Sequence, residues 1–158
     1  MKKIEIRIAS QGDREVLIKM FLNLLKFLDP FDHDMMPTRS NAEWITDTLF
    51  LPAAERGEPI LIAWEGSKAV GALFWLIQDF PYKARWRHAT EYGIYVEEGY
   101  RGQKLGTTLR EKGVKILREK GVQKLFGMVN LKNEASLKAS DRFGFRPFAR
   151  LDILDIKP

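Results

Sequence analysis

The residues with the clearest chemical potential form a glycine-rich stretch about two-thirds of the way along the chain. Residues 94–96 are typical of a strand end, a turn with Gly99, Gly102 and Gly106 follows, and a helical pattern begins at Leu105. Glycine lets a backbone approach a ligand closely, and the first N–H groups of a helix have no acceptor within it. This arrangement suits an anion, above all a pyrophosphate, although a tight turn before a helix also uses glycine for steric reasons alone.

Two familiar nucleotide-binding patterns do not fit this stretch. A P-loop requires Gly-Lys followed by Ser or Thr, whereas Gly106 is followed by Thr107 and Thr108. A dinucleotide-binding loop belongs near the first strand of a βαβ unit, with an acidic residue about twenty positions later. The stretch lies too far along the chain for that, so neither interpretation holds.

The order of residues 96–106 resembles the acyl-CoA-binding signature of the Gcn5-related N-acetyltransferases. In that family an (Arg/Gln)-x-x-Gly-x-(Gly/Ala) loop follows the fourth strand, and here the loop reads Arg-Gly-Gln-Lys-Leu-Gly. Lys104 stands where the family usually has its middle glycine. The resemblance implies acetyl-CoA as the acyl donor. It implies these cofactor-binding residues in this part of the chain: Ile94, Tyr95, Val96, Arg101, Gly102, Gln103, Lys104, Leu105, Gly106 and Thr107.

A second match to the family lies nearer the C-terminus. Asn133 can cap a helix that runs to about Arg142 and is followed by a Gly-Phe pair, which is similar to the family's Asn-x(10)-Gly-Phe helix. The resemblance therefore adds Asn133 to the cofactor-binding residues. It also implies that Ser140 takes the place of a tyrosine that commonly protonates the departing CoA thiolate. Because serine is a weak acid, water or Tyr92 is the alternative proton source.

Acyl transfer from a thioester to an amine has three chemical needs: a grip on the donor, stabilisation of the developing oxyanion, and a neutral attacking amine. The glycine-rich loop meets the first need. For the second, the resemblance points to the backbone N–H of Val96, which becomes available if strand 85–96 splays away from strand 124–129. The pantetheine arm of the cofactor would then lie in that gap like an additional strand.

The third need directs attention to strand 85–96, where a general base would face the acceptor amine. Alternation from Val96 places four side chains on one face: Ile94, Tyr92, Thr90 and His88. Glu91 falls on the opposite face unless a β-bulge redirects it. We expect Tyr92 or Glu91 to order a water molecule that takes the amine proton, with direct attack on the thioester and no covalent enzyme intermediate. The competing interpretation is that Tyr92 is a strand aromatic with a packing role.

Periodicity along the chain predicts an α/β (α+β) fold in a single domain over residues 1–158, with a mixed sheet flanked by helices. Capping boxes at Ser10 and Ser40 predict the starts of the first two helices, which end before Pro30 and at Pro52. The expected order is β-α-α-β-β-β-α-β-α-β, with a parallel pair of strands around the helix that starts at Gly106. The expected strands are 3–8, 59–64, 69–78, 85–96, 124–129 and 148–156. This arrangement also resembles the Gcn5-related acetyltransferases, so the resemblance covers nearly the whole chain.

Composition narrows the classes of function. The chain has no cysteine and two histidines, which excludes a disulfide framework, a thiolate zinc site and a cysteine nucleophile. Segment 29–37 holds three aspartates and one histidine, but turn chemistry explains them better than a metal does, so no metal is expected. In the resembled family this connection forms part of the acceptor wall, where acidic side chains would favour a cationic amine.

The net charge of +5 is concentrated toward the C-terminus: residues 97–158 carry 14 Lys/Arg against 8 Asp/Glu, and residues 1–96 carry 12 against 13. A basic chain can bind nucleic acid, but this one has no basic stripe interleaved with aromatics and no zinc-finger spacing. No apolar run reaches the length of a membrane span, and the first residues alternate like a strand. We therefore expect a cytoplasmic protein without nucleic-acid or membrane partners. A homodimer through the final strands is compatible with the sequence.

These observations lead to one expected function and one rival. The expected function is an acetyl-CoA-dependent N-acetyltransferase that acts on a primary amine of a small molecule or a protein. The rival is a non-catalytic acyl-CoA-binding sensor or scaffold, which the serine at position 140 favours. No motif specifies the acceptor amine.

Overall fold

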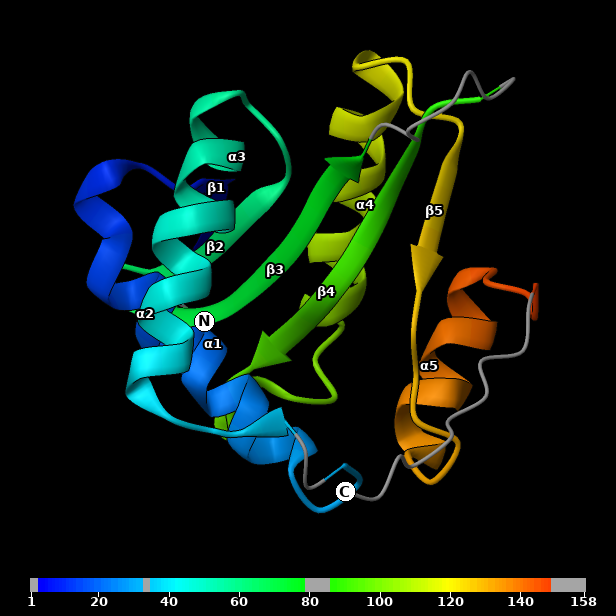
Figure 1. Ribbon diagram of the computed structural model, residues 1–158, viewed down its shortest axis with the longest axis horizontal. Helices are drawn as coiled ribbons and strands as arrows, with labels where there is room; N and C mark the ends of the chain where they lie inside the picture. Colours follow the sequence, from blue (N-terminus) through cyan, green and yellow to red (C-terminus); the bar gives the residue numbers. More distant parts are fainter. Residues whose placement is uncertain (1–2, 33–34, 79–85, 149–158) are drawn as a thin grey trace, which may run out of the picture. The chain divides into compact units, whose positions relative to one another are not determined.

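The computed structural model of the chain describes residues 3–32, 35–78 and 86–148 (Figure 1). The chain divides into two compact units, residues 1–128 and residues 129–158. In the larger unit, helices cover both faces of a five-stranded sheet. The single domain expected over residues 1–158 stays a prediction.

The sheet of the larger unit has the strand order β1-β2-β3-β4-β5. The strands are β1 (Ile4–Ile8), β2 (Ile60–Glu65), β3 (Lys68–Gln78), β4 (His88–Val96) and β5 (Lys124–Gly127). The first four strands pair antiparallel with their neighbours, and β5 pairs parallel with β4, which confirms the predicted parallel pair. β5 ends two residues before the end of the expected strand 124–129.

Helices α1 (Arg14–Leu28), α2 (Arg39–Ile45) and α3 (Leu51–Glu55) lie over one face of this sheet (Figure 1). The aromatic centre of the core on this face is Phe21, whose ring stands edge-on to Phe50 at 4.9 Å and to Phe74 at 5.2 Å between centroids. Helix α1 buries one apolar face whose residues recur at helical spacing. Its buried residues are Leu17, Ile18, Met20, Phe21, Leu24 and Leu25.

The predicted capping boxes of the first two helices have different outcomes. The box at Ser10 is present, at the 3₁₀ turn that leads into α1. The box at Ser40 is wrong, because α2 begins two residues earlier under Thr38. The Thr38 hydroxyl accepts a hydrogen bond from the backbone N–H of Asn41 at 3.2 Å.

The second helical region also continues beyond its expected end at Pro52. A π-helical turn spans Thr46–Phe50, and α3 follows directly and runs to Glu55. Pro52 thus falls in the first turn of α3, where its missing N–H is tolerated. The prediction that the helix ends at Pro52 is therefore wrong.

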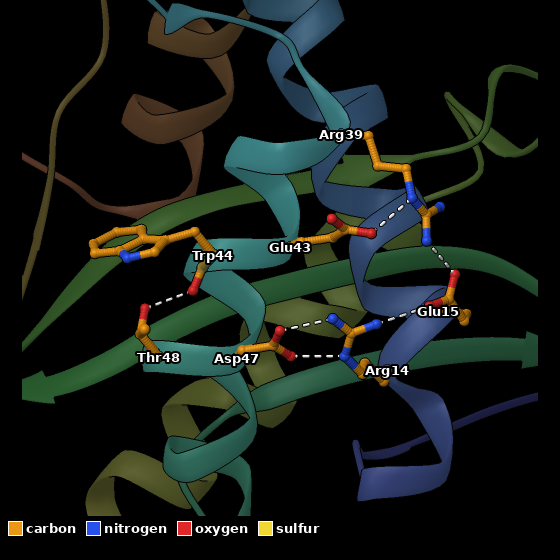
Figure 2. A network of polar contacts seen from close by, with 7 residues as sticks. All are labelled: Arg14, Glu15, Arg39, Glu43, Trp44, Asp47 and Thr48. Atoms are coloured by element: carbon orange, nitrogen blue, oxygen red, sulfur yellow. Dashed lines mark hydrogen bonds and ion pairs between the residues drawn. The ribbon is translucent and has the colours of Figure 1, made fainter.

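An exposed chain of ion pairs connects α1 with α2 and the π-helical turn (Figure 2). Its N–O distances are 2.7–2.9 Å, and its members, in order, are Glu43, Arg39, Glu15, Arg14 and Asp47. The side chains are between 36% and 63% exposed. Water and salt therefore screen this network, which is called the surface network below.

Helix α4 (Leu105–Glu119) covers the other face of the sheet (Figure 1). It packs closely at Gly113, where an added Cβ atom would lie 2.6 Å from the ring of Trp75 on β3. Leu109 and Leu117 belong to the apolar cluster on this side, which is separate from the cluster under α1. The sheet therefore has one core on each face, and β4 contributes to both.

The smaller unit contains α5 (Glu134–Phe143), which confirms the predicted helix after Asn133. The Asn133 Oδ1 atom accepts a hydrogen bond from the backbone N–H of Ser136 at 3.1 Å. Gly144, with φ of 104°, follows the helix in the left-handed region. Apart from Phe148, the expected strand 148–156 lies outside the described residues.

Candidate functional site

The glycine-rich loop connects the end of β4 to the start of α4. It begins with a 3₁₀ turn over Glu98–Tyr100, and a turn over residues 101–104 leads into the helix. The first helical hydrogen bond runs from the N–H of Thr108 to the carbonyl of Lys104 at 3.0 Å. The N–H groups of residues 105–107 precede that bond and have no acceptor within the helix, so they and the helix dipole can act together on an anion.

Lys104, at the usual position of a glycine in the family signature, adopts a conformation that glycine favours. Its φ is 63° and its ψ is 5°, in the left-handed region, and Gly102 has φ of 74°. A lysine in this region costs about 1 kcal/mol of backbone strain. The chain thus places a cation next to the N-terminus of α4 at the expense of some strain.

Arg101 and Gln103, both predicted to bind the cofactor, also hold the loop together. The Nε atom of Arg101 donates to the carbonyl of Val96 at 2.9 Å, and its guanidinium lies 5.0 Å from the ring centroid of Phe27 on α1. The Nε2 atom of Gln103 donates to the carbonyl of Gly99 at 2.9 Å. The loop is therefore shaped by its own side chains and anchored to two neighbouring elements.

Beside this loop β4 has an open edge. The pairing of β4 with β5 ends at Glu91 and Gly127, although β4 continues to Val96. Among the described residues of the larger unit, residues 92–96 therefore have no strand on that side. The sequence-based hypothesis for cofactor binding requires such a gap.

The register indicates which backbone groups face the gap. The N–H of Glu97 donates to β3 at 3.0 Å, and hydrogen-bonded positions alternate along an antiparallel ladder. The N–H and C=O groups of Val96 and Ile94 consequently point away from β3, toward the open edge. Gly106 lies against the same two residues, since an added Cβ would be 3.7 Å from the Ile94 side chain and 4.0 Å from that of Val96. The start of α4 and the open edge are thus adjacent.

A β-bulge interrupts β4 where the open edge begins. Residues 74 and 75 of β3 pair with Gly93 and Glu91, so Tyr92 is the additional residue on β4. Gly93 has φ of 152°, and an added Cβ would lie 2.4 Å from the side chain of Leu24 on α1. Glycine at this position therefore permits both the backbone conformation and the close approach of α1.

The bulge corrects the predicted grouping of side chains on this strand. Uninterrupted alternation would put Ile94 and Tyr92 on one face. In the structure Ile94 and Val96 pack in the cluster under α4, whereas Tyr92 packs in the cluster under α1. The physical reason is the additional residue, which shifts the alternation by one position between the two halves of β4.

Glu91 lies in a buried polar network on the α4 side. Its Oε1 atom accepts a hydrogen bond from Nη2 of Arg110 at 3.0 Å, and its Oε2 atom accepts one from Nε1 of Trp75 at 2.7 Å. The side chains of Glu91 and Arg110 are each 9% exposed. A bulge does redirect Glu91, but it brings both carboxylate oxygens into contact with protein donors. This geometry argues against the hypothesis that Glu91 orders a catalytic water.

Tyr92 lies on the opposite face, with its hydroxyl near other polar groups. The hydroxyl accepts a hydrogen bond from Nε2 of Gln78 at 3.4 Å, and Oε1 of Gln78 accepts one from the hydroxyl of Thr90 at 2.7 Å. The ring stands edge-on to Phe50 at 6.1 Å between centroids. Tyr92 thus has a packing role and also a hydroxyl in a polar chain that is able to order a water molecule.

Two other aromatic side chains of β4 are held in place by their neighbours. Burial, together with the nearby Glu97 carboxylate, raises the pKa of Tyr95, so its hydroxyl stays protonated at neutral pH. His88, on the face predicted to look toward the acceptor, is 7% exposed. Its ring lies 5.9 Å from Trp86 and 5.6 Å from Phe126 between centroids. Both side chains contribute to packing around the strand.

Asn133 and Ser140, the two predicted site residues of the smaller unit, are both buried, at 2% and 8% exposed. They are seven positions apart, which is about two helical turns, so they share one side of α5. The predicted residues of the larger unit gather at the end of β4, the loop and the first turn of α4.

Sequence reasoning missed Arg110 and Trp75. A signal for Arg110 exists, because it recurs with Gly113 and Leu117 at helical spacing on the buried side of α4. A charged residue on such a side predicts a buried partner of opposite charge. Trp75 lies within an apolar run, which gives no sign of a polar role.

Neither a metal centre nor a membrane span is found in the described part of the chain. Residues 3–32, 35–78 and 86–148 contain no group of three or more His, Cys, Asp or Glu side chains able to hold a metal ion. His33 and Asp34, of the aspartate-rich segment, lie outside those ranges. None of the helices described is both long and apolar enough to cross a membrane.

Three solved acetyltransferase structures have the same fold as this chain. The chain matches the ribosomal-protein-alanine N-acetyltransferase from Brucella melitensis biovar Abortus 2308 with a TM-score of 0.74 at 15% identity, covering 98% of this chain and 100% of that one. It matches AAC(6')-Iy, in complex with the bisubstrate analogue CoA-S-monomethyl-acetylneamine, with a TM-score of 0.65 at 16% identity, covering 99% of each chain. It matches the aminoglycoside acetyltransferase meta-AAC0020 from an uncultured soil metagenomic sample, in complex with sisomicin, with a TM-score of 0.65 at 16% identity, covering 98% and 95%. At these identities the likeness shows the fold.

The family itself is shown by sequence. The sequence model of the acetyltransferase (GNAT) family matches residues 19–145. The chain therefore belongs to the GNAT family, which confirms the predicted family and the predicted mixed sheet flanked by helices. Membership supports acetyl transfer as the general reaction. A search of curated protein sequences gave no match.

Proposed function

We propose that the protein is an acetyl-CoA-dependent N-acetyltransferase that modifies a primary amine of a small molecule or a protein. The observation that carries this proposal is the contact between the open edge of β4 and the first turn of α4. An extended pantetheine arm needs a free strand edge, and its diphosphate needs backbone donors. Both features occur side by side in the larger unit.

In this proposal the loop binds the donor through its backbone. The N–H groups of residues 105–107 bind the diphosphate, and the ammonium of Lys104 adds a positive charge next to them. Arg101 and Gln103 keep the loop in shape through their bonds to backbone carbonyls. The edge at residues 94–96 pairs with the pantetheine arm. Asn133 of the smaller unit is retained as a cofactor-binding residue because the family signature includes it.

Acetyl-CoA supplies an acetyl group activated as a thioester. The amine nitrogen attacks the carbonyl carbon, the C–N bond forms, the C–S bond breaks, and the thiolate leaves. The N–H of Val96, on the open edge, stabilises the oxyanion that develops between these steps. Tyr92, held by Gln78, orders the water molecule that accepts the amine proton. The thiolate takes a proton from Ser140 or from water.

We infer that the acceptor is a cationic primary amine. Two structural neighbours are aminoglycoside acetyltransferases, and another is a ribosomal-protein-alanine N-acetyltransferase. Both kinds of acceptor present a primary amine that must lose a proton before it attacks. Asp29 and Asp32, after α1, add negative charge to the segment that forms part of the acceptor wall in the family.

A non-catalytic acyl-CoA sensor or scaffold is the second candidate. Two features favour it: Ser140 stands in place of a tyrosine, and both carboxylate oxygens of Glu91 are engaged by protein donors. A protein of this kind would bind CoA without releasing thiol from acetyl-CoA.

Two measurements test the proposed function. The first is thiol release from acetyl-CoA with a panel of amines that includes aminoglycosides, polyamines and a peptide with an N-terminal alanine. The second is calorimetry with CoA on the wild type, Thr107→Asp and Thr107→Asn. Aspartate at this position suits a helix N-terminus but repels a diphosphate, so we expect it to weaken CoA binding by about 100-fold, against about threefold or less for asparagine.

Four outcomes are decisive. Thiol release that depends on the amine, together with selective loss of CoA binding in Thr107→Asp, supports the enzyme. CoA binding without thiol release supports the sensor. Absence of CoA binding in the wild type, or equal binding by the aspartate and asparagine variants, contradicts the proposed donor site.

A further inference from the structure

The buried pair of Glu91 and Arg110 lies directly beneath the bulge of β4. Glu91 is the last β4 residue paired with β5, and the additional residue, Tyr92, follows it immediately. The carboxylate therefore occupies the point at which pairing with β5 stops and the open edge starts. Arg110 reaches it from the second turn of α4, the helix whose N-terminus forms the candidate diphosphate site.

The elements that supply the partners of Glu91 are themselves tightly packed. Trp75 donates to Glu91 at 2.7 Å, and its ring fills the space above Gly113, where an added Cβ would be 2.6 Å away. A shift of Glu91 along the strand would break two hydrogen bonds and separate two buried opposite charges. On the other face of the sheet, Gly93 lies close to Leu24 of α1, and this contact restricts movement of the bulge.

The position of the bulge decides which backbone groups line the open edge. Along β4 the backbone N–H groups point alternately toward β3 and toward the open edge, and an additional residue shifts this alternation by one position. If the bulge moved, the N–H group of every residue between its old and new positions would therefore point the opposite way. If the bulge moved toward the C-terminal end of β4, the N–H groups of Ile94 and Val96 would turn toward β3. The N–H of Tyr95 would then face the gap, displaced along the strand by one residue.

We propose that the Glu91–Arg110 pair is a register lock that fixes the bulge and thereby selects the N–H groups presented at the open edge. Glu91 is then a positioning residue and not the general base. Arg110 and Trp75 act through it. The catalytic consequence rests on the proposed function, because it assumes that a thioester lies at this edge. The structural consequence, a fixed register of β4 on β3, does not.

Solution NMR of the protein without ligand reads the register directly. Facing residues in non-hydrogen-bonded pairs have Cα atoms only about 4.5 Å apart and give strong cross-strand Hα–Hα contacts. The wild type should show them between Leu73 and Ile94 and between Gly71 and Val96. The variants are Arg110→Met, Glu91→Gln and the doubly neutral Glu91→Gln with Arg110→Met. The double variant has no charge at either position, so it still tests the proposal if Arg110→Met alone does not fold.

The matched control is Asp13→Asn. Its carboxylate is 8% exposed, against 9% for Glu91, and it pairs with Arg7 on β1, at the far edge of the sheet. A general effect of removing a buried carboxylate would appear in this variant as well. We expect it to keep the wild-type cross-strand contacts and the wild-type turnover.

The register lock predicts that Arg110→Met and the double variant lose the wild-type Hα–Hα contacts between β3 and β4, or show a second set of such contacts from a shifted register. Turnover should fall in parallel by about tenfold or more, with a change in KM for the amine of about threefold or less. Unchanged contacts in both variants would overturn the proposal. So would Glu91→Gln with low turnover and wild-type contacts, because Glu91 would then act as the base. If the wild type neither binds CoA nor releases thiol, the proposed function fails, and the cross-strand contacts still decide the register lock.

Discussion

Two polar networks of the larger unit, the surface network and the buried pair of Glu91 and Arg110, use the same chemical groups in different surroundings. The surface network joins α1 to α2 through side chains that are 36–63% exposed (Figure 2). The buried pair joins β4 to α4 through side chains that are 9% exposed. The N–O distances are similar, at 2.7–2.9 Å in the first and 3.0 Å in the second. Distance alone therefore says little about what an ion pair contributes.

The two networks differ in their exposure to solvent and in the elements that they connect. In the surface network a broken pair is replaced by water, and salt screens what remains. In the buried pair, removal of one partner leaves a charge in an apolar core. The surface network connects helices on the outside of the molecule, whereas the buried pair lies under the bulge that determines the open edge. Three sets of unfolding measurements test this contrast.

The largest effect is expected for Arg110→Met. The substitution leaves the Glu91 carboxylate buried without its counter-charge, which costs about 3–5 kcal/mol of unfolding free energy. Adding Glu91→Gln should recover most of this loss, because no uncompensated charge then remains. Urea unfolding of the two variants and the wild type measures both values. A loss below about 1 kcal/mol in Arg110→Met would mean that the pair is no more important than a surface pair.

An intermediate effect is expected for Arg7 and Asp13, a pair in which one partner is exposed and the other buried. The hydrogen bond from Arg7, supported by bonds from Ser10, lowers the pKa of Asp13 to about 2. Because the pKa is lower in the folded state, the stabilisation is present above the ordinary carboxylate pKa of about 4 and is lost as the pH falls through about 2. With a discount for the exposed arginine, it amounts to about 1–2 kcal/mol at neutral pH.

Urea unfolding between neutral pH and pH 2 checks this pH dependence. The wild type should lose this stability below about pH 4, and Asp13→Asn should have lost it at every pH, so the two curves converge in acid. Parallel curves down to the lowest pH would contradict the assignment of the depressed pKa to Asp13.

The smallest effect is expected for Asp47→Asn in the surface network. Arg14 lowers the pKa of Asp47 through a hydrogen bond, but the side chains are 38% and 45% exposed, so water screens the pair. We expect a small decrease in the melting temperature at low salt that disappears in about 1 M NaCl, where charges are screened over about 3 Å. Thermal unfolding at two salt concentrations measures it. A decrease that persists in high salt would show that the surface network acts through its geometry.

Local patterns were sufficient to predict most of the described elements and the loop. The apolar stripe of α1, the alternation of the strands and the glycine-rich turn after Val96 depend on residues close together in sequence. The start of α2 was missed because Thr38 and Ser40 are both good N-caps, and local sequence alone does not choose between them. The continuation past Pro52 depends on a π-helical turn, which has no simple sequence signature.

The geometry of the candidate site depends on contacts between distant residues. The bulge is held by Arg110, nineteen positions after Glu91, and by the contact of Leu24 with Gly93. A regular alternation of β4 is the correct expectation from sequence alone, and the bulge reverses it for half of the strand. The loop was therefore predictable, whereas the side chains that face it were not.

The left-handed lysine at the head of α4 has a consequence for the speed of ligand capture. A glycine there would relieve the strained backbone but would carry no charge. Lys104 instead adds an exposed cation to the partial positive charge of the helix N-terminus. Such a charge attracts an approaching polyanion over a distance set by ionic strength, so it raises the rate of encounter in dilute salt and loses this influence as salt increases. Under the proposed function, the chain therefore gives up a little folding stability for faster arrival of its anionic acyl donor.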